Sequence, residues 1–176
     1  MILNLSVAAD SAAATAAGTL ELIRVSNATQ SWLGVEASDL SFGLNFAPVS
    51  LAVTNGELKL NQATGADRVD WSAISIDLDS DPATAAFNVD VNADVDLSVS
   101  GDAAISFDDL LTVDGSFTLV QQDADAGNVT GAPAEFAGAK ALILNLSVAA
   151  DSAAATAAGT LELIRVSNAT QSWLGV

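Results

Sequence analysis

Residues 87–102, FNVDVNADVDLSVSGD, carry the clearest periodic signal in the chain. Apolar side chains alternate with Asn, Asp and Ser side chains along almost the whole stretch. A period of two predicts an extended strand, or two strands in one line, with one apolar face and one acidic face. A helix would spread the same carboxylates around its circumference. The stretch therefore predicts a β protein.

Two other stretches repeat this alternation. Apolar residues occupy every second position over 40–46, and a similar pattern covers 111–119 across Asp114 and Gly115. A two-residue turn at Asp114 and Gly115 would mix the two faces. We therefore expect either a three-residue loop there or an uninterrupted strand through Gly115.

Asn55-Gly56 predicts a hairpin between residues 49–53 and 58–60. Both residues accept positive φ, which a two-residue type I′ turn requires. Such a turn would pair Val53 with Leu58 and keep the apolar side chains of both strands on one face.

The alanine-rich residues 10–17 and their second copy, 151–158, are the helical candidate. Asp10 could cap a helix and Gly18 could end it, and alanine is the best helix former. The segment is only about two turns long, which is marginal without tertiary support. A strand whose small side chains permit close layer packing is the alternative.

An internal repeat organises the chain. Residues 2–35 recur without change at residues 143–176, an offset of 141 positions. We interpret residues 1–35 as the tail of a preceding repeat and residues 36–176 as one complete 141-residue repeat of a longer tandem array. The junction after residue 35 has no Pro- or Ser-rich spacer, which favours a continuous structure over separate beads.

Composition excludes several function classes. The chain has 22 acidic and 5 basic residues, a net charge of -17, and neither cysteine nor histidine. Disulfides and Ser-His-Asp, Cys-His or His-ligated metal chemistry are therefore ruled out. Nucleic acid is not an expected partner, because no basic patch overrides the repulsion. Since no apolar run is long enough for a membrane helix, we expect no membrane insertion.

Two acidic stretches match the opening of a calcium loop. Pro82 replaces the glycine of the sharp turn in the first stretch, and both stretches lack the closing acid. Calcium is the one cofactor that these stretches suggest. The alternative is that each stretch is an acidic turn and not a dedicated calcium site. The candidate ligands are Asp77, Asp79, Asp81, Asp123 and Asp125.

An enzyme would need two carboxylates in a cleft. The available pairs are Asp108 with Asp109 and Asp67 with Asp70. The sequence shows no pattern of a nucleophile with a general base beside them. We therefore expect no enzymatic activity, with a carboxylate-based glycoside hydrolase as the third-ranked alternative.

Identical tandem periods, abundant Asp, Ala, Val and Thr, scarce Lys and absent Cys together resemble the stalk or extender regions of very large bacterial surface proteins and adhesins. The resemblance covers the whole chain through composition and repetition. It implies an extracellular or cell-surface role that is non-catalytic and gives length, and in such families calcium often stiffens the stalk.

The sequence thus predicts an all-β, mainly antiparallel fold in an elongated rod, either solenoid-like or a continuous curved sheet, with β-sandwich beads as the alternative. The predicted function is a structural repeat module of an extracellular fibre or surface protein. Its expected partners are further copies stacked head to tail. A β-groove for lipid or another hydrophobic ligand is the second functional hypothesis.

Overall fold

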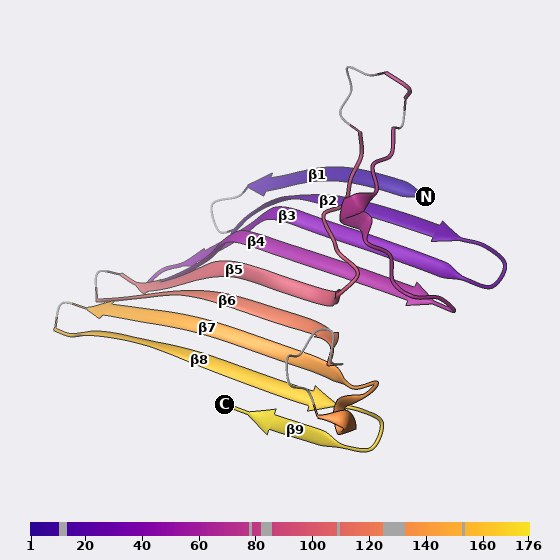
Figure 1. Ribbon diagram of the computed structural model, residues 1–176. Coiled ribbons are helices and arrows are strands. Elements are labelled where there is room, and N and C mark those ends of the chain that lie inside the picture. The colour runs from indigo at the N-terminus through magenta and orange to yellow at the C-terminus, as the bar shows by residue number, and fades with distance from the viewer. Residues whose placement is uncertain (11–13, 78, 82–85, 109, 125–132, 153) are drawn as a thin grey trace.

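The protein is all-β, and its strands form one open antiparallel sheet of nine strands in chain order (Figure 1). The computed structural model describes residues 1–10, 14–77, 79–81, 86–108, 110–124, 133–152 and 154–176. The N- and C-termini lie at opposite edges of the sheet. The strands are β1 Ile2–Asp10, β2 Ala14–Ser26, β3 Ser31–Phe46, β4 Val49–Thr64, β5 Val95–Phe107, β6 Leu111–Asp123, β7 Lys140–Ser152, β8 Thr156–Ser167 and β9 Ser172–Gly175.

The two faces of this sheet differ in chemistry because side chains alternate and the strands pair in register. The apolar face carries a row that runs unbroken through eight paired strands: Leu5, Leu20, Ala37, Leu58, Val99, Leu119, Leu144 and Leu163. The polar face carries rows such as Glu57, Ser100, Thr118, Asn145 and Glu162. The described strands all belong to one sheet, so the two packed sheets of the sandwich alternative are not seen in them.

The core lies on the polar face, where two connecting segments cover one end of the sheet. The first cover, residues 65–77 and 86–94, joins β4 to β5 and contains the 3₁₀ helix Trp71–Ala73. Its residues Trp71, Phe87, Val89 and Val91 are buried against Ile23 of β2. The second cover, residues 124 and 133–139, joins β6 to β7 and contains the 3₁₀ helix Ala134–Phe136. It packs on Val166 and Trp173 of β8 and β9.

The strongest alternating stretch, 87–102, is only half in the sheet. β5 begins at Val95, whereas residues 87–92 form the return arm of the first cover. Phe87 pairs with Ile76 in an isolated bridge, and Val89 is fully buried. The predicted alternation of apolar and polar side chains is present, but the single strand is wrong, because the first half packs on the sheet face instead of joining an edge.

The predicted hairpin at Asn55 is also wrong. β4 runs through this position, Val53 pairs with Phe42 and Ala103, and Leu58 pairs with Ala37 and Val99. Asn55 has φ of 52° and lies at a β-bulge, where its side-chain amide donates to Asp102 Oδ2 at 2.8 Å. A bulge and a two-residue turn both shift the apolar pattern by one position, so the pattern by itself does not separate them.

Gly56 is required at this bulge for a close approach. A Cβ on Gly56 would lie 2.8 Å from both the backbone oxygen and Cβ of Leu40. Leu40 follows a second bulge in β3, where Asp39 also has φ of 52°. Facing bulges on two neighbouring strands therefore change the phase of both apolar patterns together, and the apolar face stays continuous.

Of the two remaining local predictions, one is confirmed and one is wrong. The uninterrupted strand through Gly115 is confirmed, since β6 spans Leu111–Asp123. The helix over 10–17 and 151–158 is wrong in the described residues, because both alanine-rich segments form the ends of β hairpins. Ala8 pairs with Ala17, and Ala149 pairs with Ala158. Cross-strand pairing along the whole hairpin outweighs the helix propensity of two turns.

Candidate functional site

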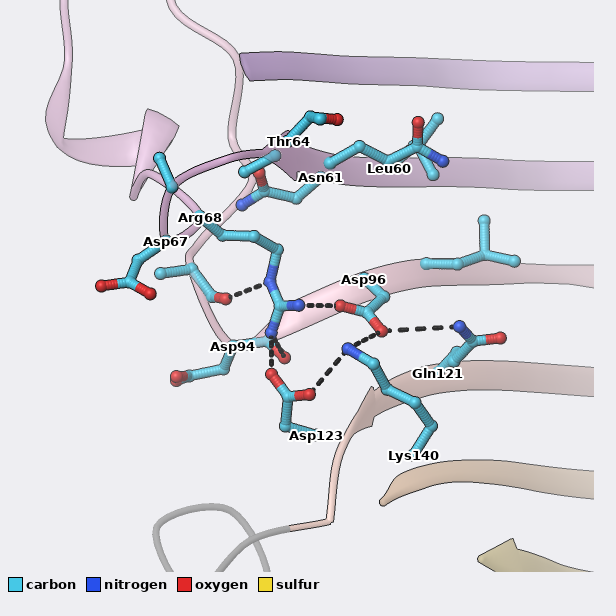
Figure 2. Close-up of a pocket in the computed structure, with 15 residues that line it drawn as sticks. Leu60, Asn61, Thr64, Asp67, Arg68, Asp94, Asp96, Gln121, Asp123 and Lys140 are labelled. Carbon is cyan, nitrogen blue, oxygen red and sulfur yellow. Dashed lines mark hydrogen bonds and ion pairs between the residues drawn. The ribbon is translucent and has the colours of Figure 1, made fainter. Parts of the chain in front are cut away.

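A cluster of ion pairs lies where β4, β5, β6 and β7 meet the two covers, and it lines an open cavity of about 990 Å³ (Figure 2). Arg68 comes from the first cover, Asp96 from β5, Asp123 from the end of β6, and Lys140 from the start of β7. Asp123 and Lys140 thus flank the second cover on its two sides. One cluster therefore joins both covers to the sheet.

Each charged group in the cluster has two partners of opposite charge. Arg68 is paired with Asp96 through Nη1 and with Asp123 Oδ2 through Nη2, the latter at 2.5 Å. Lys140 Nζ lies 2.6 Å from Asp96 Oδ2 and 2.6 Å from Asp123 Oδ1. Arg68 Nε also donates to the carbonyl oxygen of Ala93 at 2.8 Å. The two carboxylates and two cations balance in charge.

The pKa shifts in the cluster follow from this pairing. Partial burial by itself would raise the pKa of Asp123, but hydrogen bonds from Lys140 and Arg68 outweigh it and hold that pKa below 3.8. Burial would lower the pKa of Lys140, but the hydrogen bonds that its ammonium group donates to Asp123 and Asp96 raise it above 10.5. Both groups are therefore fixed in their charged forms at neutral pH, which suits a structural clamp better than proton transfer.

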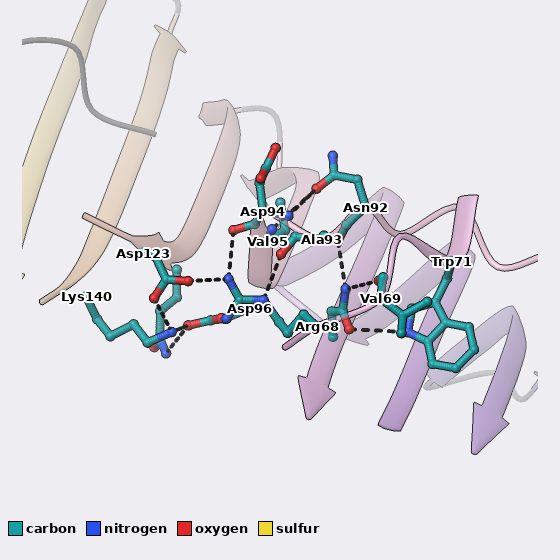
Figure 3. Close-up of polar contacts among 12 residues, drawn as sticks. Arg68, Val69, Trp71, Asn92, Ala93, Asp94, Val95, Asp96, Asp123 and Lys140 are labelled. Carbon is teal, nitrogen blue, oxygen red and sulfur yellow. Dashed lines mark hydrogen bonds and ion pairs between the residues drawn. The ribbon is translucent and has the colours of Figure 1, made fainter. Parts of the chain in front are cut away.

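Asn61 extends this polar region into the core, where it contacts Val69, Trp71 and Asn92, which Figure 3 labels. Its side chain is 1% exposed and donates to the carbonyl oxygens of Val69 at 2.8 Å and Asn92 at 2.7 Å. Its own Oδ1 accepts a hydrogen bond from Trp71 Nε1 at 3.2 Å. Asn61 of β4 thus fastens both arms of the first cover. All polar side-chain atoms that are buried among the described residues have a partner.

The proposed calcium ligands occupy two separate places. Asp77 is the exposed last residue of the first arm of the first cover, and Asp79 and Asp81 are exposed residues that follow it. Asp77 Oδ1 accepts from the backbone N–H groups of Asp79 at 3.1 Å and Ser80 at 2.6 Å. Asp123 belongs to the ion-pair cluster, and Asp125 lies outside the described residues. Within the described part of the chain, no three acidic, His or Cys side chains are grouped to hold a metal ion.

The carboxylates of the enzyme hypothesis are not gathered in a cleft in the described residues. Asp67 contributes a backbone oxygen to Trp32 Nε1 at 3.1 Å, and Asp70 accepts from Ser72 Oγ at 2.5 Å. Asp108 lies in the β5–β6 turn, and Asp109 is outside the described residues. Asp67 lines the large cavity together with Asp94, Asp96 and Asp123, but Asp70 does not. Two of these lining carboxylates, Asp96 and Asp123, are engaged by cations.

Sequence reasoning missed Arg68 and Lys140. The available signal was the scarcity of cations: with only 5 basic residues for 22 acidic ones, each cation is a candidate for pairing. Lys59 behaves likewise, since its Nζ lies 2.9 Å from Asp90 Oδ2.

The other surface with functional potential is the apolar face. Large side chains on it remain exposed across the sheet, including Phe42 at 42%, Ile105 at 37% and Leu161 at 39%. None of the helices in the described ranges has the length and apolar content to cross a bilayer. Comparisons with protein-family models, curated proteins and solved structures find no match to this chain.

Proposed function

We propose that this chain is a structural repeat module that gives length to an extracellular fibre or surface protein by adding strands to a continuous sheet. One observation carries the proposal. The identical segments 2–35 and 143–176 form the same antiparallel hairpin, six strands apart in one sheet: Asn4 pairs with Glu21, and Asn145 pairs with Glu162.

The equivalence includes the turn and the following strand. Asn27 Oδ1 accepts the backbone N–H of Gln30 at 2.9 Å, and Asn168 Oδ1 accepts that of Gln171 at 2.9 Å. Trp32 pairs with Val25 just as Trp173 pairs with Val166. A step of 141 residues therefore places the chain on the same structural element again, which is the condition for a periodic sheet.

The edges of the sheet support extension. β1 pairs with β2 and lies at one edge, while β9 pairs with only the last four residues of β8, Ile164–Ser167. In the first copy, the part of β2 that is equivalent to residues 156–163 of β8 is paired with residues 35–43 of β3. Exposed edges of this kind add strands readily.

Chains with one, two and three copies of residues 36–176 appended to residues 1–35 test this function. A continuous sheet adds roughly 29 Å per period, from six strands about 4.8 Å apart, in small-angle X-ray scattering. The midpoint of thermal unfolding should rise with the first added periods, because every period shares an interface with its neighbours. A midpoint independent of period number would show independent beads and contradict the proposal.

The alternative of a groove for a hydrophobic ligand has weaker support. One cavity among the described residues is lined by the ion-pair cluster and by polar side chains such as Asn61, Gln62 and Gln121. The second is lined by Ala, Ser and Thr residues with Asp102 and Asp114. The apolar surface of this chain is an open sheet face, not an enclosed groove.

A further inference from the structure

The apolar face lacks charge except at one end of the strands. Among the described residues, its charged strand positions are Arg24, Asp123, Lys140 and Arg165, all near the strand ends that carry the covers. Asp96 and Arg68 contact Asp123 and Lys140 at this same end. A second row, Ala14, Leu44, Leu51, Ile105, Val113, Ala150 and Ala157, crosses β2 to β8 at the opposite end. The apolar side chains of both covers pack on the other face. The rows away from the ion-pair cluster therefore stay open to solvent.

The area of this face is larger than a stable interface needs. The chain exposes 10684 Å², whereas a compact monomer of this mass exposes about 8,000 Å². Strands about 4.8 Å apart, most of them about 44 Å long and with shorter β1 and β9 at the edges, give the face roughly 1,700 Å². A standard protein interface takes about 800 Å² from each partner. The excess surface is thus sufficient for a large, apolar contact.

We infer that the apolar face packs against the same face of a second copy of this chain, giving a two-layer β-sandwich. Two sheets pack about 10 Å apart when both inner faces present apolar side chains of mixed size. Here small and large side chains adjoin. A Cβ on Gly101 would lie 3.4 Å from the Phe117 ring, and one on Gly18 would lie 2.5 Å from Leu40 Cδ2.

Charge favours a second copy over a lipid surface. With a net charge of -17 the chain is repelled by anionic headgroups. In the face-to-face pair, both polar faces with their carboxylates point outward, and the charge-free rows meet. The contact is isologous and closes at two copies. It uses the face of the sheet, whereas strand extension uses its edges, so the two proposals can fail separately.

Sedimentation equilibrium over a hundredfold concentration range tests the pairing with two neighbouring substitutions on β5. The unmodified chain should have twice the 17.7 kDa mass of one copy. Ile105→Lys places an ammonium group within the contact and should weaken pairing by about a hundredfold or more. Ala104→Lys makes the same charge change on the polar face and should leave the mass unchanged. Circular dichroism should show the same β signal for all three chains.

Single thiols provide a second measurement that hardly perturbs folding, since the chain has no cysteine of its own. On β6, Val113→Cys lies on the apolar face and Ser116→Cys on the polar face. Maleimide should modify Val113→Cys slowly at high protein concentration and faster on dilution. It should modify Ser116→Cys rapidly at both concentrations.

Three outcomes would overturn the inference. The first is a single-copy mass at every concentration, whether the face is bare or holds a lipid that extraction with organic solvent releases. The second is equal dissociation by the Ile105→Lys and Ala104→Lys substitutions. The third is growth beyond two copies that Ile105→Lys does not stop, which would instead support association through the sheet edges and leave the proposed extension intact.

Discussion

The two copies of the repeated segment have identical sequences and the same hairpin, yet their burial is reversed. Ile23 is 1% exposed, whereas its equivalent Ile164 is 37% exposed. Val25 is 48% exposed, whereas Val166 is 3% exposed. The pairing register is the same at all four positions. Local sequence therefore determines the strand pairing, and a distant segment determines which side chain of the hairpin enters a core.

The difference comes from the covers. The first cover places Trp71 and Val89 over Ile23, and the second places Ala139 and Phe136 beside Val166 and Trp173. The second cover is shorter and holds smaller side chains. Its contact with the repeat is centred on the Phe136 and Trp173 rings, 5.0 Å apart. The same hairpin thus accepts two cores because its polar face offers apolar positions to either cover.

The largest expected effect comes from removing the anchor of the first cover. Trp71→Ala leaves a cavity above Gly34, unpairs Asn61 Oδ1 and exposes Ile23, so the free energy of unfolding should fall by about 4 kcal/mol. The matched change in the second cover, Phe136→Ala, should cost only about 2 kcal/mol, since that ring is half-buried. Urea denaturation measures both. Equal losses would show that the two covers contribute alike.

The glycines one period apart sharpen the comparison further. A Cβ on Gly34 would lie 2.7 to 2.9 Å from three atoms of the Trp71 ring. Gly34→Ala should therefore cost about 2 kcal/mol. A Cβ on Gly175 would meet only Ile164 Cγ2, at 3.1 Å, so Gly175→Ala should change stability by less than about 0.5 kcal/mol. If both substitutions were neutral, the close packing of Trp71 on β3 would be contradicted.

The ion-pair cluster joins the two covers, so breaking it should loosen both. Asp123→Asn removes two ion pairs at a partly exposed position and should cost about 1 kcal/mol at neutral pH. Because the pKa of Asp123 is lowered on folding, its contribution is present above pH 3.8 and is lost as the pH falls through the lowered value. The unmodified chain and the variant should therefore converge in stability in acid. A difference that persists there would assign the loss to packing.

Lys140 provides the opposite limb of the pH profile. Its pKa is raised on folding, so its contribution is complete below pH 10.5 and is lost as the pH rises through the raised value. Lys140→Met should remove this part of the fall in the free energy of unfolding at high pH, while it retains much of the side-chain volume.

The smallest expected effect concerns the two equivalent glutamates. Partial burial and, secondarily, the facing Glu36 raise the pKa of Glu21 above 4.5. A raised pKa favours folding below pH 4.5, and this advantage is lost as the pH rises. At neutral pH, Glu21→Gln should thus stabilise the chain by about 0.3 kcal/mol. Glu162 has no facing residue in β9, so Glu162→Gln should leave the free energy of unfolding unchanged. The ionic strength dependence of the difference is a direct check, because salt screens repulsion.

Much of the sheet could be predicted from sequence. The alternation over 111–119 predicts an extended segment and allows the strand through Gly115 as one of two options, and the exact repeat predicts that one local structure recurs. Asn55-Gly56 could not be interpreted locally, because its positive φ serves a bulge that matches a second bulge at Asp39. The alanine-rich segments are equally ambiguous alone, since only a paired neighbouring strand makes them extended. Such decisions depend on strands that are distant in sequence.

The sequence by itself determined the two-faced strands, the recurrence of residues 2–35 and the excess of carboxylates, because each follows from the amino-acid sequence alone. Only the tertiary structure decided that residues 87–92 leave the sheet, that Arg68 and Lys140 bind Asp96 and Asp123, and that Ile23 is buried while Ile164 is not. The physical reason is that burial and ion pairing depend on which segments meet in space, and identical sequences meet different segments at the two ends of this sheet.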